Sequence, residues 1–256
     1  MTTTAARGAQ ARAWPGAVFD TILCGADGTE SSDVAVAQAS RLLAPDGRLE
    51  LIGVVDESAD DAQGAVEPVE LERRYDEAQE ALHEGQARYD CTRSLLVFGD
   101  PGPALASAAR HVGATLAAVG VRASGRSAGP PVDRVAAYLL DHAPCSVLIA
   151  RPSAHESRFP HSIVVGLDGS TGSEAAARVA GELAARCGAD LRVVTTEDSV
   201  LRLVGALAGA SAECDLLVVA SRGADGARRL GSVAEGIAQL ARCSVLVVRD
   251  PSDDAV

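Results

Sequence analysis

Short apolar runs alternate with longer amphipathic stretches along most of the chain. The runs have the length and aliphatic content of buried parallel strands, and they predict strands at residues 19–26, 49–55, 95–98, 116–121, 147–150, 163–167, 191–195, 216–220 and 245–248. Between them, apolar residues recur at helical spacing and predict helices at residues 29–44, 68–89, 104–112, 132–142, 174–187, 200–212 and 233–243. In the longest helix the predicted core stripe consists of Val69, Leu71, Tyr75, Ala78 and Leu82.

The alternation of strands and helices predicts a parallel, doubly wound α/β sheet, because right-handed crossovers return each strand parallel to the one before. The composition agrees with this architecture. Aromatic residues make up only 3% of the chain, so the core must consist of aliphatic side chains. Such a core suits α/β layers better than an aromatic-rich β-sandwich.

The chain contains two copies of one pattern, as three pairs of segments show. TILCGADGT begins at Thr21 and SIVVGLDGS at Ser162, an offset of 141. LAAVGVRA begins at Leu116 and LLVVASRG at Leu216, an offset of 100, while APCSVLIAR and ARCSVLVVR, which end the two copies, are offset by 98. The second copy therefore lacks about 41 residues before its second matched segment and two more in the turn that follows.

We therefore expect two tandem homologous domains, the first at residues 17–151 and the shortened second at residues 161–250, joined by a linker at residues 152–160. Residues 1–16 are expected to be a disordered tail, and residues 251–256 a second tail. The missing piece corresponds to the acidic loop, the long helix and the third strand of the first domain. Losing a strand at a sheet edge leaves the core strands paired, whereas losing a central strand would leave unpaired backbone in the core.

The charged residues argue against several classes of function. All 23 basic residues are Arg, so neither a P-loop lysine nor Schiff-base chemistry is available. The formal net charge of −12 argues against a surface for nucleic acid or for an anionic membrane. No apolar run approaches the length of a membrane span, and residues 1–16 lack the apolar core of a secretory signal. We therefore expect a cytoplasmic protein.

The cysteines and histidines show no spacing typical of a metal site. The six Cys include no CxxC pair, and Cys24, Cys145 and Cys243 lie in or beside apolar runs, where we expect buried thiols in a reducing compartment. The five His are scattered, and we interpret each as a solvated or capping residue. No Ser-His-Asp, Cys-His or paired-carboxylate constellation is visible in the sequence.

Residues 216–232 combine an apolar strand, a turn rich in Gly and Arg, and a helix that starts near Gly231 and Ser232. A helix N-terminus offers unpaired N–H groups and the positive end of the helix dipole, and glycine lets the backbone approach a phosphate closely. This stretch therefore predicts a binding site for an anion. The alternative is an ordinary surface turn with a serine N-cap.

These residues resemble the universal stress protein family in its tandem-domain form. The resemblance rests on the VGxDGS-like strand ends and APCSVL-like final strands of both halves, and on SRG…LGSVAEGI in the second. It implies a five-stranded parallel sheet in the order 3-2-1-4-5, which identifies the missing strand as strand 3, at an edge. It also implies that the fifth strands, residues 147–150 and 245–248, pair antiparallel across a pseudo-dyad.

ATP-binding members of this family carry a Gly-x2-Gly-x9-Gly-Ser/Thr pattern over strand 4 and helix 4, and the first half departs from it. Gly120 matches the first glycine, but Ala123 replaces the second, and Asp133-Arg134 replaces the Gly-Ser pair. A carboxylate at a helix N-terminus supplies its own anion and repels a phosphate. We therefore expect the first site to be degenerate.

The second half keeps more of the pattern. Ala220 replaces the first glycine, while Gly223 and the pair Gly231-Ser232 match. Only seven residues separate Gly223 from Gly231, which changes the set of N–H groups that point inward. Arg222 is a candidate for phosphate contacts, and the alternative for this arginine is an exposed surface position.

The resemblance implies two further contacts with a nucleoside. Asp27 and Asp168 follow strand 1 of each half, at the crevice where open α/β sheets bind ligands. The family pattern implies that this Asp faces the nucleoside, and that backbone near Val54 in the first half, and near Val194 and Thr195 in the second, reads the adenine edge. The alternative role for each Asp is an Asp-Gly turn that caps the next helix.

Three functional hypotheses follow. The first is a non-catalytic, stress-associated regulatory protein that binds ATP, together with Mg²⁺, in the second domain. The second is a nucleotide-independent protein-interaction or dimerisation module with degenerate ATP sites. The third is an enzyme, because related folds hydrolyse ATP with a Ser-Gly-Gly-x-Asp-Ser loop after strand 1. Residues 27–31 and 168–172 read DGTES and DGSTG, so we expect at most a weak phosphohydrolase. Expected partners are the paired fifth strands, a second copy of the chain and unidentified proteins.

Overall fold

Nine strands hydrogen-bond into one sheet in the computed structural model, which describes residues 19–57, 67–121, 132–195, 199–221 and 231–249. The strands are β1 (Thr21–Gly25), β2 (Arg48–Val55), β3 (Arg93–Phe98), β4 (Leu116–Gly120), β5 (Ser146–Ala150), β6 (Ser162–Leu167), β7 (Asp190–Thr195), β8 (Leu216–Ala220) and β9 (Ser244–Val248). The helices are α1 (Glu30–Leu42), α2 (Pro68–Arg88), α3 (Pro101–Val112), α4 (Arg134–His142), α5 (Thr171–Cys187), α6 (Val200–Ala210) and α7 (Ser232–Leu240), with a 3₁₀ turn η1 (Glu156–Arg158).

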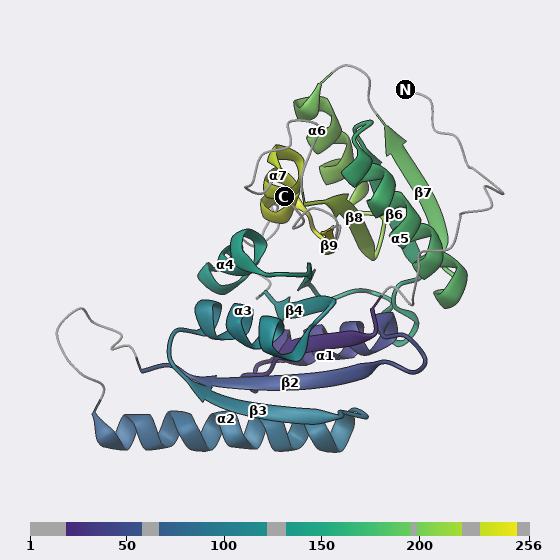
Figure 1. Ribbon diagram of the computed structural model, residues 1–256. Coiled ribbons are helices and arrows are strands. Elements are labelled where there is room, and N and C mark those ends of the chain that lie inside the picture. The colour runs from purple at the N-terminus through teal and green to yellow at the C-terminus, as the bar shows by residue number, and fades with distance from the viewer. Residues whose placement is uncertain (1–18, 58–66, 122–131, 196–198, 222–230, 250–256) are drawn as a thin grey trace.

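The sheet joins the two halves of the chain edge to edge (Figure 1). Its order is β3-β2-β1-β4-β5-β9-β8-β6-β7, which is 3-2-1-4-5 in the first half followed by 5-4-1-2 in the second. The predicted α/β class, the strand order and the loss of strand 3 from the second half are therefore confirmed. Within each half the strands are parallel, whereas β5 and β9 pair antiparallel with Leu148 opposite Leu246.

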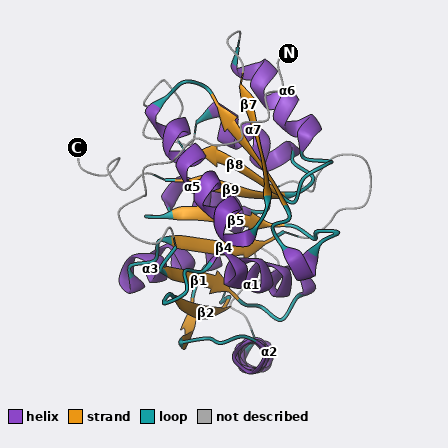
Figure 2. Ribbon diagram, turned by 90° about the vertical axis from the view of Figure 1, so that its right-hand side faces the viewer, coloured by secondary structure: helices purple, strands orange, loops and turns teal. Residues whose placement is uncertain are grey.

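Helices cover both faces of the sheet (Figure 2). One core lies under α3, α4, α6 and α7, and the other lies under α1, α2 and α5. Each core contains residues of both halves, so the apolar layers continue across the β5–β9 boundary. The side chains are mainly Val, Leu, Ile and Ala, as the low aromatic content predicts.

Local capping explains where several helices begin and end. Thr29 is the N-cap of α1, and its side chain accepts a hydrogen bond from Ser32 N. Ser170 caps α5 in the same way, by accepting from Ser173 N. Helix α5 ends at Gly188, whose φ of +67° lies in the left-handed region that favours glycine. The matched strand ends of the two halves therefore lead into matched helix caps.

Two equivalent arginines each form hydrogen bonds with the opposite half of the chain. Arg151 follows β5 and donates to Ala238 O (2.7 Å) and Cys243 O (3.3 Å), at and just beyond the end of α7. Arg249 follows β9 and donates to Leu140 O (3.2 Å), near the end of α4. Each guanidinium thus meets carbonyl oxygens at the negative end of a helix that belongs to the other half. This exchange extends the contact between the halves from the strands to the helix ends.

The predicted core stripe of α2 is wrong over its first half. Ala78 and Leu82 are buried, but Val69 is 78% exposed and Tyr75 is 37% exposed. The reason is length: the 21 residues of α2 span about 31 Å, whereas the eight residues of β2, on which the helix packs, span about 26 Å. The overhanging part carries Tyr75, whose ring stacks on that of Phe98 at a centroid distance of 6.1 Å. None of the helices in the described ranges, α2 included, is long and apolar enough to cross a membrane.

Candidate functional site

The carboxyl ends of β6 and β8 form the crevice of the second half, because the chain leaves β6 toward β7 on one side and returns to β8 on the other. The structure brings three of the predicted site residues together there, namely Asp168, Ala220 and Gly231. The walls of the small cavity between them also include Leu203 of α6 and Val233 of α7. Its volume is about 10 Å³, which is room for about one water molecule.

Asp168 holds the loop between β6 and α5. Its Oδ1 accepts hydrogen bonds from Ser170 N (3.0 Å) and Ser170 Oγ (2.6 Å). Burial raises the pKa of this carboxyl, but hydrogen bonds from Ser170 and Ser173 outweigh burial and hold the pKa below its usual value. The Asp-Gly turn is therefore present, but Ser170 and not Asp168 caps α5, and the Asp168 carboxylate also lines the cavity.

Helix α7 begins at the cavity without a side-chain cap from any described residue. Gly231 is its N-cap, and the serine N-cap considered above is not formed, because Ser232 is the first helical residue and is exposed. Gly231 N donates to Ser221 O at 2.7 Å, which closes the turn between β8 and α7. The first turn of α7 thus lies at the cavity, which Gly231 and Val233 line, and the first N–H groups of a helix have no partner within the helix.

The other predicted residues of the second site are placed differently. Val194 lies on β7 beside Gly166 of β6, is partly buried, and packs against the core under α6 and α7. Thr195 ends the strand and is exposed. Neither residue lines the small cavity. Arg222 and Gly223 lie outside the described residues.

The first half has the same arrangement of strands and helices, but a side chain caps the N-terminus of its helix α4. Asp133 is the N-cap of α4, and its side chain accepts from Ala136 N at 2.8 Å, so the carboxylate occupies the position that the sequence assigned to it. Arg134 points elsewhere, toward Asp100 in an exposed ion pair of 3.3 Å. Ala123 lies outside the described residues.

The remaining residues of the first site have structural roles. Asp27 accepts from Thr29 N (3.0 Å) and Thr29 Oγ1 (2.6 Å), as Asp168 does from Ser170. A Cβ at Gly120 would lie 1.8 Å from Ser31 O, so glycine there permits β4 to pack against the first turn of α1. Val54 is partly buried on β2 and contacts the core under α3.

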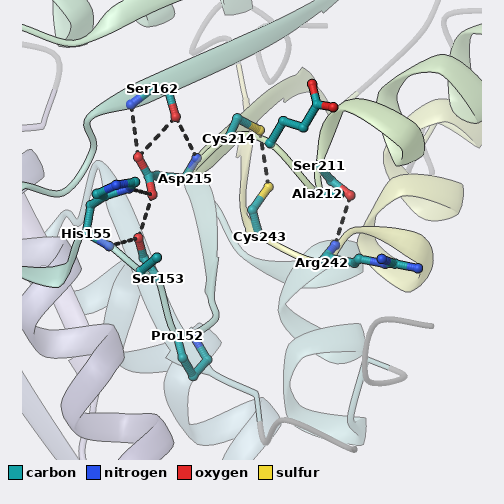
Figure 3. A pocket seen from close by; sticks show the side chains of 12 residues that line it. Pro152, Ser153, His155, Ser162, Ser211, Ala212, Cys214, Asp215, Arg242 and Cys243 are labelled. Atoms are coloured by element: carbon teal, nitrogen blue, oxygen red, sulfur yellow. Dashed lines mark hydrogen bonds and ion pairs between the residues drawn. The ribbon is translucent and has the colours of Figure 1, made fainter. Parts of the chain in front are cut away.

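Sequence reasoning missed a second, larger cavity at the opposite end of β8, with a volume of about 340 Å³ (Figure 3). At its edge, Asp215 is only 5% exposed and accepts hydrogen bonds from four residues. Oδ1 accepts from Ser153 Oγ (2.6 Å) and contacts His155 Nδ1 (3.1 Å). Oδ2 accepts from His161 N (3.1 Å), Ser162 N (3.0 Å) and Ser162 Oγ (3.1 Å). Burial raises the pKa of Asp215, but hydrogen bonds from Ser153, His155 and Ser162 outweigh it and hold the pKa below its usual value.

Asp215, Ser153, His155, His161 and Ser162 form a cluster, called here the Asp215 cluster, which connects the linker between the halves to the sheet. It is not a nucleophilic triad, because Ser153 donates to Asp215 itself and not to the imidazole of His155. The internal repeat contains a signal for it. The equivalent residue of the first half is Thr115, which exchanges hydrogen bonds with Thr21 at the start of β1. A carboxylate at this repeat position is long enough to reach the linker as well as the strand.

The cavity also contains two thiols that the sequence did not bring together. Cys214 and Cys243 precede β8 and β9, and their sulfur atoms lie 3.6 Å apart. Cys24, Cys145 and Cys243 are buried thiols, as predicted, and none of the three forms a disulfide. Within the described residues, no group of three or more His, Cys, Asp or Glu side chains is arranged to hold a metal ion.

Comparisons with known proteins agree on a family. The sequence model of the universal stress protein family matches residues 19–151 and 203–249. A universal stress protein of Mycobacterium tuberculosis is 30% identical over 190 residues, which cover 54% of this chain and 62% of that protein. A second one from the same organism is 34% identical over 122 residues, which cover 47% of this chain and 37% of that protein. The chain thus matches less than two thirds of the length of these relatives.

The fold agrees with the same family. A universal stress protein from Archaeoglobus fulgidus superposes with a TM-score of 0.70 at 14% identity, over 90% of this chain and 98% of that one. At this identity the superposition shows the shared fold, while the sequence model, which matches most of the chain, shows the relationship. The chain therefore belongs to the universal stress protein family.

Proposed function

We propose that this chain is a non-catalytic, stress-associated regulatory protein that binds an adenine nucleotide at the β6–β8 crevice of its second half. The contrast between two equivalent helix ends carries the proposal. Helix α4 is capped by the carboxylate of Asp133, whereas α7 begins at Gly231 with no side-chain cap from the described residues. An uncapped helix N-terminus attracts a phosphate through its N–H groups and its dipole.

The remaining walls of the crevice suit the other parts of a nucleotide. Asp168 is ionised and stands beside the first turn of α7, where it can accept hydrogen bonds from ribose hydroxyls or an exocyclic amine. Because Asp168 is negative, the phosphates are expected at the α7 end and the nucleoside at the Asp168 end. A Mg²⁺ ion would then accompany the triphosphate.

Binding requires the walls of the crevice to separate. The cavity measures about 10 Å³, whereas ligand pockets typically measure about 300–1,000 Å³. Helices α6 and α7 are in close contact, since a Cβ at Gly236 would lie 3.1 Å from Val204. We therefore expect the nucleotide to displace α6, which carries Leu203 into the cavity wall.

The test is isothermal titration of ATP with Mg²⁺ into nucleotide-stripped protein. We expect about one site per chain, and we expect Gly231→Asp to abolish it by reproducing the arrangement at Asp133. The φ of −66° at Gly231 suits an aspartate, so this variant should fold. Asp133→Ser is the matched control, because it changes the equivalent cap in the first half and should leave the affinity unchanged. An equal loss of binding in both variants would place the site elsewhere.

A second candidate function is a nucleotide-independent interaction module. It is favoured by the closed cavity and by the hydrogen bonds that Asp168 already accepts from Ser170. Absence of heat on titration, with no nucleotide in an acid extract of freshly purified protein, would favour this candidate. Product analysis of the titrated sample tests the weak phosphohydrolase, since turnover would release ADP or AMP.

The proposal extends to assembly and location. Because β5 and β9 pair with each other inside the chain, a homodimer must use a different surface. Light scattering on the eluted protein tests this part, and a particle mass of one chain, 26.1 kDa, would remove it. The proposed location is the cytoplasm, a reducing compartment in which the buried thiols of Cys24, Cys145 and Cys243 stay reduced.

A further inference from the structure

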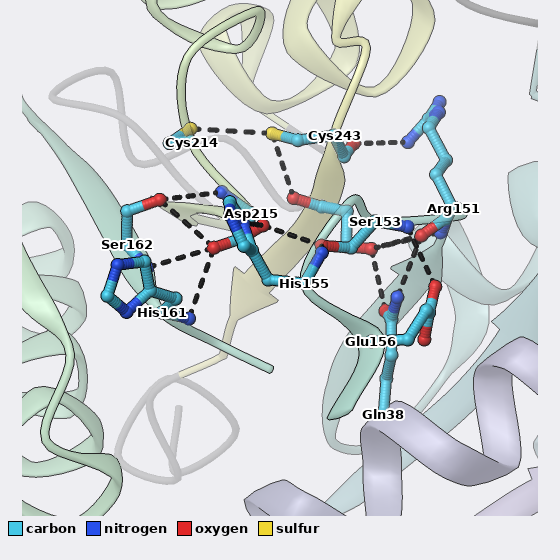
Figure 4. A network of polar contacts seen from close by, with 11 residues as sticks. Gln38, Arg151, Ser153, His155, Glu156, His161, Ser162, Cys214, Asp215 and Cys243 are labelled. Carbon is cyan, nitrogen blue, oxygen red and sulfur yellow. Dashed lines mark hydrogen bonds and ion pairs between the residues drawn. The ribbon is translucent and has the colours of Figure 1, made fainter. Parts of the chain in front are cut away.

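Two thiols face each other beside the larger cavity (Figure 4). The sulfur atoms of Cys214 and Cys243 are 3.6 Å apart, and Cys243 Sγ also lies 3.4 Å from Ser244 O. Either thiol can be the donor in the contact between the two sulfur atoms. Hydrogen bonding with Cys214, followed by burial, raises the pKa of Cys243 well above its ordinary value, so this thiol keeps its proton at rest.

The backbone around the two thiols has the spacing that a disulfide needs. Each cysteine stands just before one of two neighbouring parallel strands, β8 and β9, and Ser244 N donates to Asp215 O at 3.2 Å between them. Because Leu216 pairs with Ser244, Cys243 is level with Asp215, and Cys214 lies one residue before that level along the chain direction. One residue along a strand (about 3.3 Å) and one strand across (about 4.8 Å) give a separation of about 6 Å, which falls within the range of about 4.4–6.8 Å that a disulfide accepts between Cα atoms. A side-chain rotation can therefore close the gap without separating the strands.

The larger cavity admits a small oxidant to this pair. Cys214 and Cys243 both line it, and its volume of about 340 Å³ exceeds that of a small hydroperoxide several-fold. Cys214 is partly exposed, whereas Cys243 is 5% exposed. The hydrogen bonds of Asp215 to the linker and to β6 hold the adjoining wall in place. Cys214 is thus the thiol that an oxidant meets first.

We propose that Cys214 and Cys243 form a dithiol modification site, which a hydroperoxide oxidises to an intramolecular disulfide. Cys214 releases its proton to solvent and attacks the peroxide oxygen, so the O–O bond breaks and the leaving oxygen takes up a proton. The product is a sulfenic acid on Cys214. The sulfur of Cys243 then attacks that sulfur, and the departing hydroxide leaves as water with the proton of Cys243. Overall, two thiols and one hydroperoxide give one disulfide, one alcohol or water, and one further water.

The other partly exposed cysteines provide a contrast. Cys91 Sγ donates to Arg93 O at 2.9 Å, and Cys187 Sγ lies 3.9 Å from Arg41 O. These two thiols contact backbone carbonyls, so oxidation there is expected to add oxygen or to leave the thiol unchanged. Cys187→Ser is therefore the matched control for changes at Cys214 and Cys243.

The test treats the folded full chain with hydrogen peroxide, then blocks the remaining thiols with an alkylating agent in denaturant, and measures mass before and after tryptic digestion. We expect the protein to lose two hydrogens and to retain four alkylatable thiols of its six. Cleavage at arginine separates the two cysteines, which lie in peptides 203–222 and 243–249. We expect these peptides to be joined before reduction and separate after treatment with dithiothreitol.

Cys214→Ser and Cys243→Ser should each lose the linked peptides, while Cys187→Ser should still form the link. Cys214→Ser should retain five alkylatable thiols, and Cys243→Ser should retain four, because its oxidised Cys214 no longer reacts as a thiol. Circular dichroism establishes that each serine variant is folded. In Cys243→Ser, the sulfenic acid on Cys214 should accumulate and react with dimedone. Any of three results in folded wild-type protein would overturn the proposal. The pair could stay unoxidised, Cys214 could gain oxygen without forming a link, or the link could involve another cysteine.

Discussion

At the residue scale, the repeat shows how one substitution changes the role of a position. Thr115 in the first half exchanges hydrogen bonds only with the start of the neighbouring strand, at Thr21. Its equivalent, Asp215, keeps that pairing with Ser162 and also binds the linker through Ser153 and His155. A buried carboxylate with this many donors stabilises the fold only while it is ionised.

The first prediction concerns Asp215. Asp215→Asn puts an NH₂ donor where an oxygen accepts, and should lower the free energy of unfolding at pH 7 by about 3 kcal/mol. The folded pKa of Asp215 lies below its ordinary value of 3.8, so this stabilisation is complete above about pH 4 and is lost as pH falls through the folded pKa. Urea unfolding at pH 7 and pH 3 should therefore show a smaller difference between wild type and variant at pH 3. The exposed Asp100→Asn should change stability by less than about 0.5 kcal/mol at pH 7.

The second prediction concerns Gly120, which the family pattern assigns to the ligand and the structure assigns to packing. Gly120→Ala places a methyl group against the backbone of Ser31 and should lower the free energy of unfolding by about 2–4 kcal/mol. The equivalent Ala220→Gly should cost only about 1 kcal/mol. Urea unfolding measures both. A neutral Gly120→Ala would mean that the first turn of α1 moves freely and that packing is not the reason for this glycine.

At the element scale, the two halves differ in how the helix after strand 4 begins. Helix α4 has a carboxylate cap, and α7 has a glycine. The capped end is more stable by itself, because a carboxylate satisfies an N–H group and opposes the dipole. The uncapped end is the one that can gain from an anionic ligand. Stability and binding are thus expected to change in opposite directions at α7.

The third prediction follows from this contrast. Gly231→Asp should raise the free energy of unfolding by about 0.5 kcal/mol in the absence of nucleotide, while it abolishes ATP binding. Asp133→Ala should lower it by about 1 kcal/mol. Thermal unfolding with and without ATP measures both effects in one series. A Gly231→Asp protein that ATP still stabilises would contradict the assignment of the phosphates to α7.

At the scale of the whole molecule, one sheet and two shared cores join the halves. Arg151 and Arg249 add hydrogen bonds from each half to a helix end of the other. Arg151 is 2% exposed, and its guanidinium donates to carbonyl oxygens of α7 and of the turn after it. Gln38 of α1 and Ser244 of β9 also bond to its backbone oxygen, at 2.7 and 3.1 Å. The halves are therefore expected to unfold together.

The fourth prediction tests this coupling. Wild-type protein should unfold in a single calorimetric transition, and Arg151→Ala should lower the free energy of unfolding by about 3 kcal/mol, because it leaves buried carbonyls unpaired and opens a cavity. Arg249→Ala, at a less buried site, should cost about 1–2 kcal/mol. Two separate transitions in the wild-type protein would show that the shared sheet does not couple the halves.

Several features of this protein could be read from the sequence alone. The order of strands and helices, the repeat and the caps at Thr29 and Gly188 are local properties, because each depends on periodicity or residue type over a few positions. The strand order and the missing edge strand came from the repeat together with the family resemblance, and the structure agrees with both.

Other features were decided only by the tertiary structure. The overhang of α2 depends on the length of the sheet beneath it, and the closed crevice at Asp168 depends on how α6 packs on α7. The Cys214–Cys243 contact joins residues 29 positions apart. Gln38 donates to Arg151 O and accepts from Ser244 Oγ, which lie 113 and 206 positions away in the chain. Such contacts depend on the register between strands, and register follows from how the buried faces pack. A local pattern determines which face of an element is buried, but not which distant side chain it meets.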